Sequence, residues 1–172
     1  MNRKLIVPLL VAVAGAGVIP GSASAASPAR CTTTQLSAHL GTGGAAAGSQ
    51  YVPVVWTNKS THACTLNGYP GVSYVAPSNG HQVGAAATRN PQHPANTVTL
   101  KPGGHASALV QMTDYQNYPK SRCKATSVSG LRVYPPGSHS AEYVKFKVVR
   151  KACSTKVNQL SVMAVVKGKS GQ

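Results

Sequence analysis

Apolar and polar residues alternate along most of this chain, with the two-residue period of β-strands rather than the period of helices. Within residues 51–57, Val52, Val54 and Trp56 occupy every second position, and we expect Trp56 in the core. Within residues 144–148 they alternate with Lys145 and Lys147. The pattern recurs at Leu36–Leu40, Val98–Leu100, Ala106–Met112, Leu131–Val133 and Leu160–Val166. Each segment predicts a strand with one face on a core and the other in water.

Turn residues separate these segments. The Asn79–Gly80 pair lies between Val72–Ala76 and His81–Gly84, and predicts a tight hairpin because both residues tolerate positive φ. Lys101–Gly104 and Pro135–Gly137 place proline where φ is fixed and glycine where φ turns positive. About eight short strands joined by such turns predict one all-β domain, an antiparallel Ig-like β-sandwich.

The first residues have the features of a secretory signal peptide. Arg3 and Lys4 precede an apolar run that extends to about residue 19, and the small residues Ala23-Ser24-Ala25 follow. Glycine and proline interrupt the run, which falls short of the ~20 apolar residues that a membrane span requires. We therefore expect cleavage after Ala25, with cleavage after Ala29 as the alternative.

This cleavage gives the expected organisation of the chain. Residues 1–25 form the signal peptide, 26–30 a flexible N-terminus, 31–166 the β-sandwich and 167–172 a flexible tail. Because Arg30 precedes Cys31, this cysteine does not follow the motif that directs lipid attachment. We expect a secreted, extracellular protein that associates with the cell wall and has no lipid anchor.

Four cysteines follow the expected cleavage site: Cys31, Cys64, Cys123 and Cys153. An even number in an exported chain predicts two disulfides, and four cysteines allow three pairings. We expect Cys31–Cys64 and Cys123–Cys153, because this pairing closes loops of similar size in the two halves of the chain. A zinc site is not expected, since no closely spaced cysteine pair is present.

Charge is distributed unevenly. The chain has 17 lysines and arginines but only two acidic residues, Asp114 and Glu142. After the expected cleavage the net charge is +13, of which +9 falls in residues 114–172. The predicted anion-binding patch comprises the basic residues that dominate this region: Lys120, Arg122, Lys124, Lys145, Lys147, Arg150, Lys151 and Lys156. The Cys123–Cys153 bond would draw the basic segments around both cysteines together.

The same shortage of acids restricts the possible chemistry. Acid/base catalysis needs cooperating carboxylates or a carboxylate that orients a histidine, and magnesium and calcium sites need several oxygen ligands. The six histidines lack the His-x-His and His-x-x-x-His spacings of metal sites, and no Gly-x-Ser-x-Gly motif is present. We expect no catalytic residues, no cofactor and no bound metal.

The glycine-rich segment Asn67-Gly68-Tyr69-Pro70-Gly71 follows Cys64 closely. Its glycines permit positive φ, and Tyr69 offers an apolar ring with a polar tip. We interpret the segment as a structural corner that holds Cys64, with a ligand-binding loop as the alternative. Arg89 allows the same two interpretations, as an anchor for backbone carbonyls or as a binding group.

Several of these motifs occur together in a known family. The ordered segments are Cys64–Val72, Gly80–Gly84, Thr88–Arg89, Val98–Ala106 and Leu131–Gly137, preceded by Cys31…Leu36 and Val54–Asn58. In these motifs the chain resembles exported actinobacterial proteins and lipoproteins that carry the domain of unknown function 4232. The resemblance implies an extracytoplasmic, disulfide-bonded β-sandwich and implies no activity. Many members resemble lipoproteins, and this chain differs because it lacks a lipid-accepting cysteine.

Charge and export together suggest a function. We expect a non-catalytic, monomeric binding domain whose partner is an anionic wall polymer or an anionic lipid surface, and we expect no physiological nucleic acid. One alternative is a protein–protein interaction module, such as an extracellular protease inhibitor with Asn67–Val72 as its inhibitory edge. A second is a metal-binding protein or enzyme. The basic surface could also serve only solubility, because exposed lysines discourage pairing between sheet edges.

Overall fold

The alternating segments form the strands of two sheets that enclose one core, and the fold is the expected antiparallel Ig-like β-sandwich. It is seen in a computed structural model that describes residues 27–172, so that the expected signal peptide lies outside the described residues. The seven-stranded sheet has the order β1 (Leu36–Leu40), β3 (Ser49–Asn58), β9 (His105–Thr113), β12 (Leu160–Val162) and β7 (Thr88–Arg89), with β2 (Gly44–Ala46) beside β3 and β13 (Val166–Lys167) beside β9.

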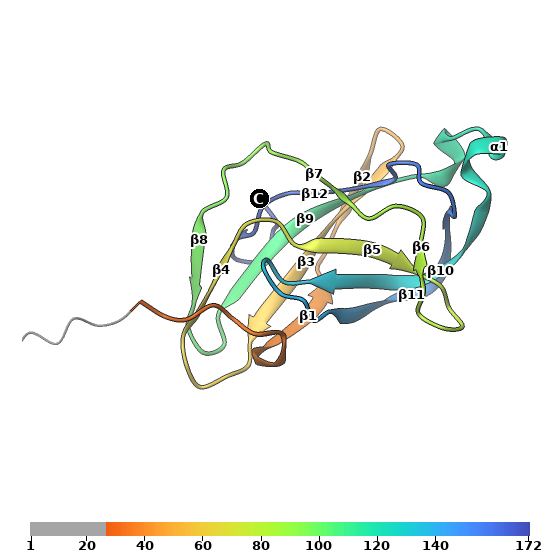
Figure 1. The fold of residues 1–172 in the computed structure, drawn as a ribbon. Helices are drawn as coiled ribbons and strands as arrows, with labels where there is room; N and C mark the ends of the chain where they lie inside the picture. The colour runs from red at the N-terminus through yellow and green to blue at the C-terminus, as the bar shows by residue number, and fades with distance from the viewer. Residues whose placement is uncertain (1–26) are drawn as a thin grey trace, which may run out of the picture.

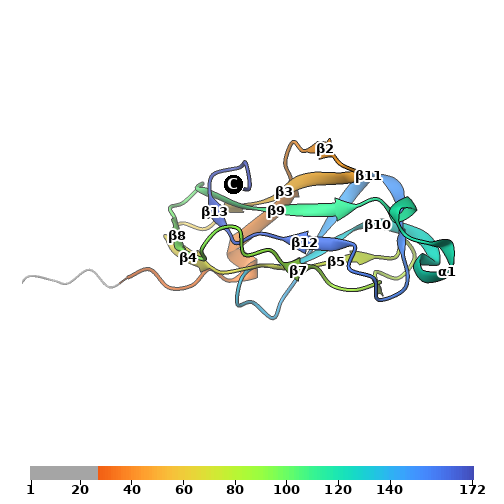
Figure 2. The same cartoon turned by 90° about the horizontal axis from the view of Figure 1, so that it is seen from above.

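The second large sheet has four strands. Their order is β11 (Glu142–Cys153), β10 (Ala125–Tyr134), β5 (Gly71–Val75) and β6 (Gln82–Val83). A separate antiparallel pair is formed by β4 (Cys64–Asn67) and β8 (Thr97–Leu100), and the helical turns are η1 (Thr33–Gln35), η2 (Tyr115–Asn117) and α1 (Lys120–Cys123). The helix α1 lies at one end of the sandwich and the β4–β8 pair at the other (Figures 1 and 2).

The core is built from the positions that alternation marks as inward-facing. Val54 and Trp56 of β3 belong to the same buried cluster as Val128, Leu131 and Val133 of β10, and all five are fully buried. The expected core position of Trp56 is therefore confirmed. Burial of one valine or leucine side chain stabilises the folded state by about 1.5–3 kcal/mol.

The described residues contain more strands than the expected eight, because several strands are very short. The alternating run at the C-terminus forms two strands, since β12 ends at Val162 and β13 begins at Val166. The sequence of β4 also alternates, although it was not among the predicted strands. Cys64 and Leu66 are buried, and Thr65 between them is partly exposed. The two residues of β7 pair in parallel with β12, a long-range contact that no local pattern indicates.

The two proline–glycine turns form as predicted. Gly103 and Gly137 have φ values of 72° and 71°. In each turn the N–H of the residue after the glycine donates to the carbonyl of the residue before the proline, at 2.8 and 2.9 Å. These turns have the proline and glycine positions of type II turns, and they connect β8 to β9 and β10 to β11.

The third turn differs from the prediction. β5 and β6 form the expected hairpin, but the loop runs from residue 76 to residue 81 instead of being a tight two-residue turn. Gly80 has a φ of 65°, whereas Asn79 is not among the residues with positive φ. The last hydrogen bond between the two strands joins the Ala76 N–H to the His81 carbonyl at 2.9 Å. The Asn79–Gly80 pair therefore lies within a longer loop and does not form the turn alone.

Both terminal segments that were expected to be flexible make hydrogen bonds to the sandwich. The Thr65 N–H donates to the Ala29 carbonyl at 2.9 Å. At the C-terminus, Ser107 Oγ donates to the Gly168 carbonyl and accepts from the Gly171 N–H, each at 2.9 Å. Residues 166–172 therefore follow β9, because Ser107 supplies hydrogen-bonding partners on the face of the sheet that they cover. Within residues 27–172, no helix combines the length and the apolar character that crossing a membrane requires.

Candidate functional site

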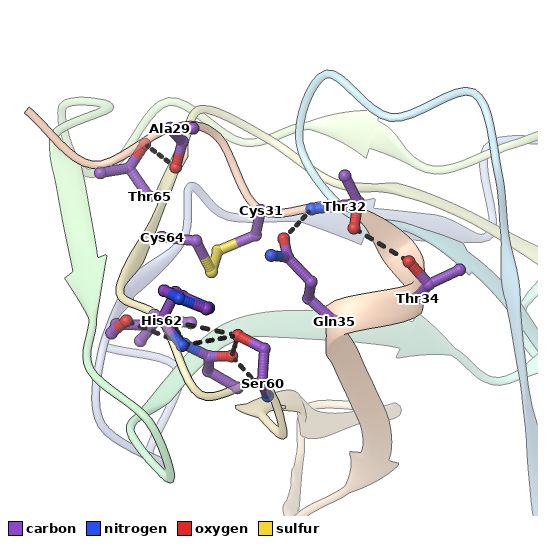
Figure 3. Close-up of a disulfide and its surroundings, with 11 residues drawn as sticks. Ala29, Cys31, Thr32, Thr34, Gln35, Ser60, His62, Cys64 and Thr65 are labelled. Atoms are coloured by element: carbon purple, nitrogen blue, oxygen red, sulfur yellow. Dashed lines mark hydrogen bonds between the residues drawn. A yellow bond between two sulfur atoms is a disulfide. The ribbon is translucent and has the colours of Figure 1, made fainter.

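The disulfides have the predicted pairing and lie near opposite ends of the sandwich. Cys31 is bonded to Cys64, with 4.8 Å between the Cα atoms, and Cys123 is bonded to Cys153, with 4.5 Å. Figure 3 shows the first bond between two local pairings. On one side the Thr65 hydroxyl donates to the Ala29 carbonyl at 3.4 Å. On the other side the Thr32 N–H donates to Gln35 Oε1 at 2.9 Å.

The second disulfide joins the basic segments that precede β10 and follow β11. The Ser154 N–H donates to the Cys123 carbonyl at 3.0 Å, and its hydroxyl donates to the Lys124 carbonyl at 2.8 Å. Thr155 donates to the Arg122 carbonyl. Four predicted patch residues are exposed on these two segments, and we call them the disulfide-end cluster: Lys120, Arg122, Lys124 and Lys156.

The remaining predicted patch residues lie on β11, where the strand register separates them. Lys145 pairs with Gly130, and Lys151 pairs with Ser127 and donates to its hydroxyl at 3.3 Å. Both lysines are exposed, as is Lys147. We call Lys145, Lys147 and Lys151 the β11 lysines.

A bulge interrupts β11 between these lysines. Val128 pairs with Arg150, and Gly130 pairs with Lys145. Between these two pairs β10 has one residue, Ser129, whereas β11 has four, residues 146–149. The extra residues leave Val148 and Val149 67% and 62% exposed, although valines usually lie in cores. The sequence carries one signal of this bulge, because alternation breaks at the adjacent apolar residues Val148 and Val149.

Two of the β11 lysines line an open groove between β11 and β1, the edge strands of the two large sheets. The groove has a volume of about 1320 Å³, and Lys145, Lys147, Lys169 and His39 are among the residues that line it. Lys169 was not predicted as a site residue because its segment was expected to be a free tail. The hydrogen bonds of Ser107 to that segment bring Lys169 to the groove.

Arg150 differs from the other predicted patch residues because it lies on the inward side of β11. It pairs with the fully buried Val128, so its side chain shares the core-facing side of the four-stranded sheet. The guanidinium lies 4.8 Å from the centre of the Phe146 ring and donates to Gln50 Oε1. Arg150 is therefore held between the sheets and does not extend outward with the β11 lysines.

The glycine-rich loop packs against the sandwich. Gly68 has a φ of 105°, and its carbonyl accepts from the Val165 N–H at 2.9 Å. Asn67 donates to the Thr97 hydroxyl at 2.9 Å, and Pro70 is buried. The Arg89 guanidinium lies 5.7 Å from the centre of the Tyr69 ring. These contacts give Asn67, Gly68 and Pro70 structural roles, and Gly71 packs where a larger residue would meet the Tyr134 ring.

Both acidic residues accept hydrogen bonds from the backbone. Asp114 Oδ1 caps η2 by accepting from the Gln116 N–H at 2.9 Å. Glu142 Oε2 accepts from the Ala38 N–H at 2.8 Å and so connects β11 to β1. Among residues 27–172, no group of three or more His, Cys, Asp or Glu side chains is arranged to hold a metal ion.

The surroundings of His105 lower the pKa of this histidine. The His105 ring nitrogen Nδ1 lies 2.9 Å from the Thr57 hydroxyl. Burial lowers the pKa of His105, and the positive charges of Lys169 and His39 lower it further. The C-terminal segment and β1 therefore both place basic groups near this part of β9.

Comparison with known proteins agrees with the resemblance seen in the motifs. No curated protein and no solved structure matches the chain. A family model described as "Domain of unknown function (DUF4232)" matches residues 31–166, a range that includes both disulfides, the glycine-rich loop and all the basic residues of β11. The chain therefore belongs to the family of this domain of unknown function.

Proposed function

We propose that this protein is an exported, non-catalytic binding domain that associates electrostatically with anionic polymers of the cell envelope or the extracellular space. The main support for this proposal is that exposed basic side chains gather near the Cys123–Cys153 disulfide and along the edge strand β11. The disulfide-end cluster and the β11 lysines together supply seven exposed positive charges. A surface of this kind attracts polyanions over a distance set by the ionic strength.

Export is part of this proposal and rests on two observations. The N-terminal residues have the order of a secretory signal, with a basic start, an apolar run and small residues at the expected cleavage site. All four cysteines of the described residues form disulfides, which persist in oxidising compartments outside the cytosol. Outside the cell, anionic wall polymers and anionic lipid surfaces are the abundant polyanions that this surface would meet.

A non-catalytic role is supported by the use of the two carboxylates. Asp114 caps a helical turn and Glu142 joins two edge strands, so each has a structural partner. Acid/base catalysis would need a carboxylate or histidine positioned for proton transfer. The proposal therefore assigns binding to the lysines and structural support to the acids.

Salt dependence of binding tests the proposal. The mature protein is incubated with washed cell walls and with purified anionic wall polymer at increasing sodium chloride concentration. We expect saturable binding at low salt that weakens steeply, by at least about tenfold between 50 and 200 mM, as for proteins that displace counterions from a polyanion. Binding that is independent of salt, or absent at low salt, would contradict the proposal.

A charge-matched pair of variants identifies the surface involved. Lys145→Ser/Lys147→Ser removes two charges from the groove, and Lys59→Ser/Lys101→Ser removes two exposed charges near the opposite end. At about 1 kcal/mol for each basic residue near an anionic surface, the first variant should bind the polymer about tenfold or more weakly. The second should retain most of the affinity. Equal losses in both variants would show that net charge, not this surface, determines binding.

The exposed apolar residues of β11 favour a second candidate, a protein-interaction module. Tyr143, Val148 and Val149 are the large hydrophobic residues that the structure exposes, and all three lie on this edge strand. An edge strand can accept a strand from another protein. Specific binding to one extracellular protein that is insensitive to Lys145→Ser/Lys147→Ser, but is abolished by Val149→Lys, would favour this candidate over the polymer.

A further inference from the structure

A second concave site lies between the two large sheets. Lys151 contributes to its lining, whereas the groove lysines Lys145 and Lys147 do not. It is a cleft of about 670 Å³ that is lined by β2, β3 and β9 of one sheet and by β5 and β11 of the other. Met112 and Val148 provide apolar walls, while Tyr74, Asp114 and Arg150 provide polar groups. Small-molecule sites commonly combine apolar walls with a few fixed polar groups in this way.

Tyr74 contributes a buried phenol to this cleft. Its side chain is only 5% exposed, and its ring packs edge-on against Phe146 with 6.2 Å between the ring centres. Among residues 27–172 the Tyr74 hydroxyl is not one of the fully buried polar atoms that lack a partner, so it reaches the open space of the cleft that Tyr74 lines. Burial raises the pKa of Tyr74, so its hydroxyl stays protonated and can donate to a ligand.

Arg150 contributes a positive charge whose orientation is already fixed. Its inward position opposite Val128 is one that an apolar residue would normally occupy in a sandwich. Gln50 accepts one guanidinium hydrogen bond, and the Phe146 ring lies beneath the group. A guanidinium has five N–H donors, and so this contact leaves donors available for a planar oxyanion. Tyr74 and Arg150 both contact Phe146, which places the phenol and the guanidinium around the same ring.

The charges in the cleft restrict the class of ligand. Arg150 and Lys151 carry two positive charges, and Asp114 carries one negative charge. The negative charge disfavours a dianion, while the net positive charge favours a monoanion. We propose that the cleft binds a small carboxylate that has an apolar part, with its carboxylate on Arg150 and Tyr74 and its apolar part against Met112 and Val148.

Benzoate is a suitable probe, because it combines one carboxylate with one apolar ring. Binding to the mature protein is followed by NMR, with acetate as the probe that lacks the ring and benzamide as the isostere that lacks the charge. We expect saturable benzoate binding, with weaker binding of both comparison probes. Failure of benzoate to bind in a saturable manner, or equal binding of benzamide, would overturn the proposal.

Two variants test the residues that carry the inference. Tyr74→Phe keeps the ring packing and the net charge, and loss of its hydrogen bond should weaken benzoate binding about 2- to 10-fold. Arg150→Gln should weaken it about 10- to 100-fold, because a charge-assisted contact is lost. The control Arg122→Gln removes the same charge from the disulfide-end cluster and should leave benzoate binding unchanged.

The outcomes separate this site from the proposed polymer surface. If Tyr74→Phe binds benzoate as tightly as the unmodified protein, the cleft is not the site. If Arg122→Gln and Arg150→Gln lose the same affinity, benzoate responds only to net charge, which also overturns the inference. Tyr74→Phe should bind wall polymer normally, and a protein that failed to bind wall polymer would still give a decisive result with benzoate.

Discussion

The two disulfides close loops of similar length, yet their surroundings on the protein surface differ greatly. The bonded cysteines are 33 residues apart at one end and 30 at the other. Beside Cys31, Arg30 lies against the Gly137 turn, where a larger residue would collide with its guanidinium. Beside Cys123, the disulfide-end cluster carries four exposed basic side chains. The same kind of covalent bond therefore supports a hydroxyl-rich end with few basic side chains and a strongly basic end.

This difference indicates that the disulfides belong to the scaffold and that the charge is placed on it separately. Hydroxyl and amide groups surround Cys31 and Cys64 in Figure 3, and the fully buried Asn58 joins this region to β8 by donating to the Leu100 carbonyl at 3.0 Å. At the other end, hydrogen bonds from Ser154 and Thr155 hold the backbone of the basic segments while leaving the lysine side chains exposed.

Removal of each disulfide should have the largest effect on stability and tests whether the two bonds are equivalent supports. Cys31→Ser/Cys64→Ser and Cys123→Ser/Cys153→Ser should each lower the free energy of unfolding by about 3–4 kcal/mol, because the loops have nearly equal length. Chemical denaturation measures both losses. Only the second pair should also weaken polymer binding when measured on folded protein, and equal binding by both variants would remove the functional difference between the ends.

The two acidic residues offer a comparison with an intermediate effect. Glu142→Ala leaves the Ala38 N–H without its partner at the contact between β11 and β1, and should cost about 1–3 kcal/mol. Asp114→Ala removes a cap from a single short turn, and should cost about 0.5–2 kcal/mol. Thermal unfolding of both variants provides the ranking, and a larger loss for Asp114→Ala would contradict the role of Glu142 in joining the two sheets.

The position of the C-terminal segment predicts a smaller effect, visible in the titration of His105. Burial and the nearby Lys169 and His39 charges hold its pKa below the ordinary value of about 6.5. A histidine whose folded pKa is lowered destabilises the fold as pH falls through its unfolded pKa, because the unfolded chain binds the proton more readily. NMR titration should show His105 titrating below its ordinary value, and Lys169→Ser should raise its pKa. An unchanged pKa in that variant would mean that Lys169 does not lie near His105.

Much of the scaffold could be predicted because its determinants are local. Alternation of apolar and polar residues identified β3, β9 and β11, and proline followed by glycine identified two turns, since both signals depend only on neighbouring residues. The disulfide pairing followed from loop lengths. The parallel pairing of β7 with β12 could not be predicted, because it joins residues that are more than seventy positions apart in the chain.

The candidate sites were less predictable because they depend on register and on contacts across the sandwich. Alternation from Val144 through Phe146 already placed Arg150 on the inward side, but its place among a run of basic residues suggested an outward patch. Lys169 reaches the groove through backbone contacts to Ser107, which no motif indicates. Tyr74 could be recognised as inward-facing, but its position at a cleft depends on the opposite sheet.

The central claim concerns which surface meets the polyanion, and an NMR titration of the isotope-labelled mature protein with purified anionic wall polymer tests it most directly. The account predicts amide shifts on β11 and on the segments of the disulfide-end cluster, around residues 120–124 and 154–156. Added salt should reverse these shifts, because the interaction is electrostatic. Shifts confined to the opposite end, around Lys59 and Lys101, or a complete absence of shifts at low salt, would contradict the account.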